Sequence, residues 1–142
     1  HQHRCEVITL ERTQASAQQA LVLNVKEGTS IFHSVMVHYE NDLPVQIEDR
    51  CVNAEIVPEY LAQDYSQTTP HAYLSLIAPL TEGEHIVEAV RASAEECALL
   101  NIKEHDPCLL IRRKTWSASS IVSHARLLFP GSRYRLQGRF MS

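Results

Sequence analysis

The sequence has few of the residues and motifs by which an enzyme or a membrane protein is usually recognised. Only four of its 142 residues are glycine, and it contains neither a P-loop nor a G-x-G-x-x-G dinucleotide-binding motif. A G-x-S-x-G nucleophile elbow and an H-E-x-x-H zinc motif are also missing. No apolar run approaches the ~18 residues needed to span a bilayer. These absences favour a protein that binds other molecules without catalysis, and they argue against a membrane partner.

Cysteines are few and widely spaced. The four are Cys5, Cys51, Cys97 and Cys108, and no two have the C-x-x-C spacing of a zinc or redox site. The chain shows no secretory apolar segment. Scattered free thiols are typical of a reducing compartment. We therefore expect a cytoplasmic protein.

The eight histidines do not form a metal-binding pattern. His1 and His3 lie at a chain end, and chain ends commonly fray. His33 and His38 are five positions apart on a predicted strand, so they point to opposite faces and cannot share a metal ion. The other four are isolated, namely His71, His85, His105 and His124. We expect hydrogen-bonded or surface histidines, with no metal and no cofactor.

The charge balance argues against a nucleic-acid-binding domain. The chain has 13 Lys and Arg against 17 Asp and Glu, a formal net charge of -4, whereas such domains are normally basic. Two local basic stretches, 112–114 and 133–139, are most simply interpreted as solvated strand faces. The composition, 44% hydrophobic and 21% charged, predicts one globular domain over residues 1–142. Since the chain begins His-Gln-His without methionine, we expect it to be a piece of a longer protein.

Hydrophobic periodicity predicts an α+β fold on a mainly antiparallel sheet of about six strands. The strands are predicted at 5–12, 30–40, 44–53, 84–92, 108–118 and 120–129. Helices are predicted at 14–23, 69–78 and 93–100, with a short helical turn inside 54–65. Thr69 and Pro70 are typical of a helix start, and Ser93 with Glu96 forms a capping box.

The alternation of apolar residues in 30–40 and 44–53 determines the register of this hairpin. When the apolar faces of the two strands pair, His38, Glu48 and Arg50 share the opposite face. A slip by one residue would mix polar with apolar positions, which a half-buried sheet resists. Charges on strand faces are costly to bury unless they are paired. This polar face is therefore either exposed to solvent or the wall of a pocket.

A pocket would be closed by the helix that begins at Thr69. A helix start offers free N–H donors and partial positive charge, which suit a carboxylate or phosphate. The polar strand residues that could line such a pocket are His38, Glu48, Arg50, Glu88, Arg91 and Arg126. The alternative is a solvent-exposed sheet face with no ligand.

Four stretches along the chain carry a family pattern. They are the hairpin NDLPVQIEDRCVN, the helix start TPHAYLSL, the run HIVEAVRASAEECALLNIKEHDPCLLIRR and the tail FPGSRYRLQGRF. In this order they resemble UTRA domains, the effector-binding half of GntR-type transcription regulators of the HutC group. The resemblance covers nearly the whole chain.

The resemblance implies a chorismate-lyase-like fold and a homodimer, which the apolar residues of 108–129 also favour. It implies a winged helix-turn-helix domain before this chain, and operator DNA would be bound only through that domain. It makes the arginine-rich tail 129–140 the last strand of the sheet. Tyr134 then takes the position where a tyrosine of relatives contacts the effector.

Relatives that bind sugar phosphates carry an arginine ten residues before a glutamate on this hairpin. Here the glutamate is Glu48 and the arginine position holds His38, while a second arginine position holds Met36. A serine of relatives is replaced by His71. These differences imply a smaller, flatter ligand. For regulators of histidine utilisation within the group, it would be urocanate, an imidazole joined to a carboxylate.

We expect such a ligand between the sheet and the helix that starts near Thr69. Its carboxylate would meet Arg50, another strand arginine, or the N–H groups around His71 and Ala72.

The ring end of the ligand would meet different residues. Its imidazole N–H would be accepted by Glu48. Tyr73 and Tyr134 would stack on the planar ligand or hydrogen-bond it, since a tyrosine has an apolar face and a polar tip.

Two other functions remain open at this stage. One is an enzyme of chorismate-lyase-like architecture acting on a small carboxylate, with Arg50, Arg91, Arg126 and Glu88 as its polar pocket. The other is a plain dimerisation module whose polar strand face is wet.

Overall fold

Six antiparallel strands form one sheet in the computed structural model, which describes residues 2–139. The strands are β1 (His3–Gln14), β2 (Ser30–Glu40), β3 (Leu43–Val52), β4 (Glu82–Arg91), β5 (Pro107–Ser117) and β6 (Ser120–Pro130). The helices are α1 (Ala17–Leu23), α2 (Pro70–Ile77) and α3 (Ala94–Leu100), with a single 3-10 turn η1 (Tyr60–Ala62). The predicted fold class and element order are confirmed.

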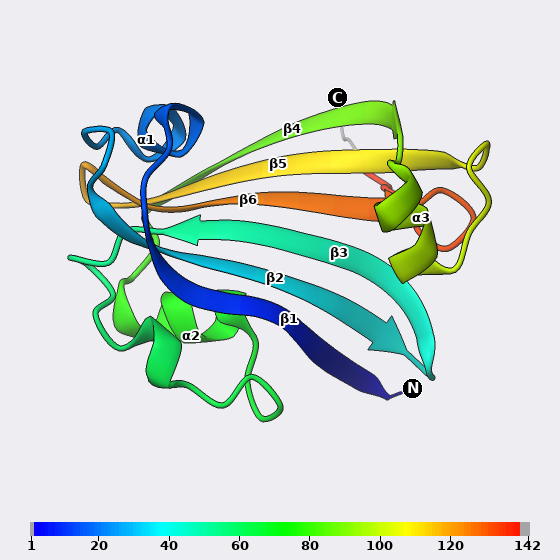
Figure 1. Cartoon of the computed structure of the whole chain (residues 1–142), viewed down its shortest axis with the longest axis horizontal. Helices are drawn as coiled ribbons and strands as arrows, with labels where there is room; N and C mark the ends of the chain where they lie inside the picture. Colours follow the sequence, from blue (N-terminus) through cyan, green and yellow to red (C-terminus); the bar gives the residue numbers. More distant parts are fainter. Residues whose placement is uncertain (1, 140–142) are drawn as a thin grey trace.

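The spatial order of the strands is β1-β2-β3-β6-β5-β4. Tight connections join β2 to β3 and β5 to β6, with Asn41, Asp42 and Ala118 in left-handed backbone conformations. The long segment between β3 and β4 carries η1 and α2 and takes the chain to the far edge of the sheet. Strands β1 and β4 are therefore the two edges, and β3 and β6 meet at the centre (Figure 1).

Short-range capping determines where each helix begins and ends. Ser93 and Glu96 form the predicted capping box of α3, and Ser16 forms an equivalent box at α1. Thr69 caps α2 by accepting from the N–H of Ala72, with a proline at the first helical position as predicted. Helices α1 and α3 both end at an asparagine in the left-handed conformation.

The two faces of the sheet are covered differently, as Figure 1 shows. One face, here called the α2 face, packs Phe32, Met36 and Val52 against η1 and α2. The other, the α1/α3 face, has α1 at one end and α3 at the other. No helix among residues 2–139 is long and apolar enough to cross a membrane.

The arginine-rich tail is not a strand, so this prediction is wrong for residues 131–139; Phe140 lies outside the described residues. Strand β6 ends at Pro130 because its partner β5 starts at Pro107, which leaves the tail no strand to pair with. At Gly131 the chain turns so closely over Pro107 that an added Cβ would lie 2.8 Å from the Pro107 carbonyl oxygen. Arg133 then donates to the carbonyl groups of Pro44, Leu100 and Asn101, which fixes the tail against α3.

Candidate functional site

A chain of hydrogen-bonded polar side chains, buried except for His3 at one end, crosses the α2 face. His38 Nε2 lies 2.9 Å from Glu48 Oε1, and Arg50 Nε donates to Glu48 Oε2 at 2.9 Å. Arg50 Nη1 donates to Ser123 Oγ, also at 2.9 Å. At the other end, His3 Nε2 is 2.9 Å from His38 Nδ1. Residues from β1, β2, β3 and β6 thus form one connected set.

The hairpin register explains this set and confirms the prediction made from alternation. Met36 is opposite Glu48 and Ser34 is opposite Arg50, so the polar residues of β2 and β3 share the α2 face. His33 lies on the other face, where its Nε2 is 2.8 Å from Asp49 Oδ1. Within the described residues, no buried side-chain nitrogen or oxygen lacks a hydrogen-bond partner.

Glu48 is an ionised acceptor. Burial by itself would raise the pKa of its carboxyl, but the charge of Arg50 and the hydrogen bond from His38 outweigh burial and lower that pKa to about 2. Because an ionised carboxylate can only accept, the proton in the shared bond belongs to Nε2 of His38. Glu48 is thus suited to an N–H donor on a ligand.

A cavity of about 220 Å³ opens over this set. Its walls are His3, His38, Gln46, Glu48, Arg50, Thr69, His71, Arg113 and Leu127. Drug-sized ligands occupy cavities of roughly 300–1,000 Å³, so this one suits a smaller molecule. It lies between the sheet and the start of α2, where the sequence predicted a pocket.

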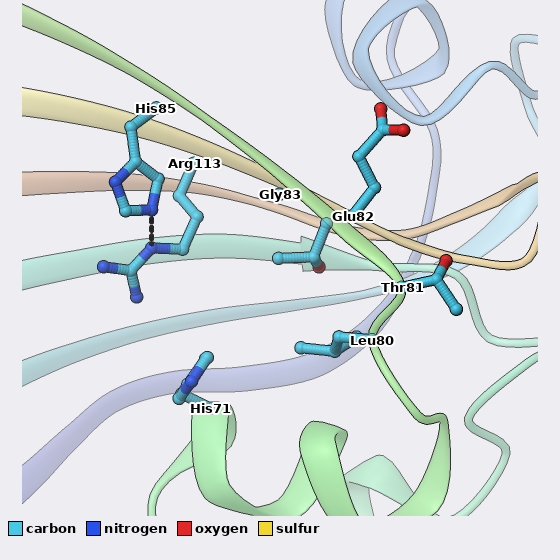
Figure 2. A pocket seen from close by; sticks show the side chains of 8 residues that line it. His71, Leu80, Thr81, Glu82, Gly83, His85 and Arg113 are labelled. Atoms are coloured by element: carbon cyan, nitrogen blue, oxygen red, sulfur yellow. Dashed lines mark hydrogen bonds between the residues drawn. The ribbon is translucent and has the colours of Figure 1, made fainter.

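A second cavity of about 380 Å³ adjoins the first and shares His71 and Arg113 with it. Figure 2 shows this second cavity between the start of α2 and the strands β4 and β5. Arg113 Nε donates to His85 Nε2 across its wall at 2.8 Å. The two cavities are thus neighbours, with His71 and Arg113 between them.

Most of the predicted site residues come together here. His38, Glu48, Arg50, Thr69 and His71 all line the smaller cavity.

Neither of the two predicted tyrosines lines this cavity. Tyr73, a residue of α2, is buried in the core between this helix and the sheet. Tyr134 stacks on Phe129 at 3.8 Å between ring centroids and packs near Leu127, which is a wall residue.

Glu88 and Arg126 are not part of this group. Glu88 accepts from Arg112, and Arg126 donates to Glu96 of α3. Both pairs lie on the α1/α3 face, because in the β3–β6 pairing Arg126 is opposite Asp49 and not Glu48. Arg91 is exposed at the end of β4 and lines neither cavity.

Sequence reasoning missed four wall residues, namely His3, Gln46, Arg113 and Leu127. Alternation in the hairpin does place Gln46 on the face of Glu48, but Gln46 is not among the predicted site residues. Arg113 and Leu127 reach the site only through the pairing of β3 with β6 and of β6 with β5. No local pattern in the sequence specifies those pairings.

Chemically the site offers an acceptor, several donors and an apolar wall at Leu127. Among residues 2–139, no group of three or more His, Cys, Asp or Glu side chains could hold a metal ion. Such a set of groups can hydrogen-bond a small polar molecule.

Comparison with known proteins gives consistent results. Residues 1–135 match the family model described as UTRA domain. The histidine utilization repressor of Klebsiella aerogenes is 78% identical over 142 residues, which are 100% of this chain and 59% of that protein. The repressor of the same name from Pseudomonas aeruginosa is 61% identical over 142 residues, again 100% of this chain and 57% of its own length. The chain thus spans less than two thirds of these relatives.

Solved structures agree on the fold. The C-terminal domain of histidine utilization repressor from Pseudomonas syringae is 57% identical, with a TM-score of 0.95 over 99% of this chain and 100% of that one. PhnF from Mycobacterium smegmatis has a TM-score of 0.89 at 18% identity, covering 99% of this chain and 63% of that one. At that identity the likeness concerns the fold alone.

Proposed function

Because the chain belongs to the UTRA domain family, whose members bind small-molecule effectors, we propose that it is the effector-sensing domain of a transcriptional repressor of histidine utilisation. The repressor would act in the cytoplasm. The identity to proteins named histidine utilization repressor supports the choice of pathway. The polar cavity under α2 supports the effector-sensing role.

The effector is urocanate or a close relative. The observation that carries this proposal is Glu48, an ionised carboxylate on the wall of a small cavity. Such a group accepts an N–H donor, which an imidazole provides, and Leu127 supplies an apolar wall for a flat ring. Histidine-pathway compounds that combine an imidazole with a carboxylate therefore match the site.

The domain would work as a homodimer and control DNA binding by a winged-helix domain outside this chain. The apolar residues of 108–129 give little support for dimerisation, since Leu110, Ile111 and Leu128 are buried in the domain's own core. Edge strand β4 instead exposes Ile86 and Val87. A symmetric, isologous contact is the expected form. Analytical ultracentrifugation that shows only monomer at high micromolar concentration would contradict it.

Thermal unfolding with urocanate, histidine and chorismate tests the proposal against its alternatives. Urocanate should raise the melting temperature most, since a ligand that binds only the folded state stabilises it. Stabilisation by chorismate alone would favour the lyase-like enzyme. If none of the three raises the melting temperature, the polar sheet face is simply exposed to solvent and the domain is a plain dimerisation module.

A further inference from the structure

The effector proposed above has a carboxylate, and the structure narrows where that group can bind. Arg50 is poorly placed for it, because it is 1% exposed and its Nε and Nη1 already donate to Glu48 and Ser123. Its Nη2 takes part in neither bond, but a side chain that is 1% exposed presents little surface to a ligand. Arg50 therefore holds Glu48 in place.

The start of α2 is a poor alternative. Its first residue is proline, which has no N–H. The N–H of Ala72 donates to the Thr69 hydroxyl, and the N–H of Tyr73 donates to the Thr69 carbonyl. The capping that starts the helix thus leaves the N–H of His71 as a single donor, whereas an arginine offers a carboxylate a pair of donors.

Arg113 differs from both. It lies half-buried on β5 at the junction of the two cavities. Its Nε donates to His85, and no carboxylate within residues 2–139 forms an ion pair with it. In Figure 2 the terminal nitrogens of the guanidinium point away from His85 and towards the side where His71 lies.

The charges around the junction favour an anion. Arg50 and Arg113 are both cations, since arginine stays protonated in proteins. Glu48 is the one carboxylate among the residues that line the smaller cavity, and Glu82, which lines the larger cavity, points away from Arg113 in Figure 2. Burial and the charge of Arg113 lower the pKa of both His71 and His85, so these two rings are neutral at neutral pH. A half-buried excess of positive charge is costly until an anion compensates it.

We propose that Arg113, oriented by His85, binds the carboxylate of a planar monocarboxylate ligand at the junction of the two cavities. This inference rests on the proposed function for the identity of the ligand, but not for the chemistry of the contact. The paired terminal nitrogens of an arginine match the two oxygens of a carboxylate. The rest of the ligand then extends into the smaller cavity towards Glu48.

His85 acts as a positioning residue. By accepting from Nε, it fixes the plane of the guanidinium and leaves the two terminal nitrogens for the ligand. Because this role needs only an acceptor at the same place, His85→Gln should preserve carboxylate binding better than His85→Phe. A merely structural role would not separate carboxylate binding from ring binding.

The test divides the ligand into its two ends. Acrylate carries the carboxylate alone, imidazole carries the ring alone, and urocanate carries both. Binding of each probe is followed by NMR titration, which also reports on the Nε–H signal of Arg113. The variants are Arg113→Gln, Arg113→Lys, His85→Gln and His85→Phe. Arg112→Gln is the matched control. Arg112 is the residue before Arg113, the substitution is the same, and its side chain pairs with Glu88 on the opposite face.

We expect Arg113→Gln to weaken acrylate and urocanate binding by about tenfold to a hundredfold and to leave imidazole binding unchanged. Arg113→Lys should show an intermediate loss, because lysine keeps the charge without the paired donors. His85→Phe should weaken acrylate binding without affecting imidazole. Arg112→Gln should match the parent for all three probes.

The outcomes separate this inference from the proposed function. If the Arg113 signal does not respond to acrylate, or if Arg113→Gln binds acrylate as well as the parent does, the carboxylate anchor is wrong. If acrylate binds through Arg113 but urocanate binds no more tightly than acrylate, the anchor stands and urocanate is not the effector. Arg113→Lys decides the matter if Arg113→Gln unfolds.

Discussion

The two faces of the sheet carry similar arginine–glutamate pairs in different surroundings. On the α2 face, Arg50 Nε lies 2.9 Å from Glu48 Oε2, and the side chains are 1% and 5% exposed. On the α1/α3 face, Arg112 Nε lies 2.8 Å from Glu88 Oε1, and the side chains are 40% and 45% exposed. The bond lengths are nearly equal, so the distance says little about what each pair contributes.

Burial decides the difference between the two pairs. An exposed pair gains little, because water screens it and two long side chains must be held still. A buried pair has lost its hydration and depends on its partners being complete. On the α2 face His38, Ser123 and Thr115 complete the set around Glu48 and Arg50. The α2 face is therefore sensitive to the loss of one member, and the α1/α3 face is tolerant.

The largest expected effect is on Arg50. Arg50→Ala leaves Glu48 buried without its cation and should lower the free energy of unfolding by about 3–5 kcal/mol. Arg112→Ala removes an exposed partner and should cost less than about 1 kcal/mol. Urea denaturation of the two variants and the parent measures both changes. Equal losses would mean that burial does not separate the faces.

Acid should act on the α2 face through Glu48. Its folded-state pKa, about 2, lies below its ordinary value of 4.5, so its contribution is complete above pH 4.5 and is lost as the pH falls towards 2. This difference corresponds to about 3 kcal/mol. Glu48→Gln has no such titration, so its unfolding free energy should fall less between pH 4.5 and pH 2. Parallel pH profiles for the parent and Glu48→Gln would contradict this.

Ligand binding should depend on the same carboxylate. Glu48→Ala should weaken urocanate binding by roughly tenfold to a hundredfold, because a charged hydrogen bond to the ring is lost. Lys26→Ala, an exposed change before β2, should bind like the parent. Calorimetry on protein shown to be folded compares the two. If Glu48→Ala binds as tightly as the parent, the ligand binds elsewhere.

The smallest effect is expected on the α1/α3 face. The hydrogen bond from His33 to Asp49 raises the pKa of His33, so its stabilisation is complete below its ordinary value of 6.5 and is lost as the pH rises through the raised pKa. Since Asp49 is 46% exposed, Asp49→Asn should cost less than about 1 kcal/mol, and only on the acidic side. Thermal unfolding of Asp49→Asn and the parent at a pH below 6.5 and at a pH well above it measures the difference. A loss of stability that appears only at the higher pH would contradict the prediction.

Local patterns predicted much of this protein. Alternation in the β2–β3 hairpin correctly placed His38, Glu48 and Arg50 on one face, since a one-residue slip would bury the wrong side chains. The caps at Thr69 and Ser93 were recognised because capping depends on residues three positions apart. These features depend on neighbours in the chain, and the sequence by itself determines them.

Only the tertiary structure decided which strands became neighbours. The pairing of β3 with β6 put Glu48 opposite Leu127 and moved Arg126 to the other face, and the pairing of β4 with β5 put His85 opposite Arg113. The tail, which alternates like a strand, found no partner once β5 began at Pro107. Contacts between residues so far apart depend on how the whole sheet buries its two faces, and no short stretch of sequence contains that information.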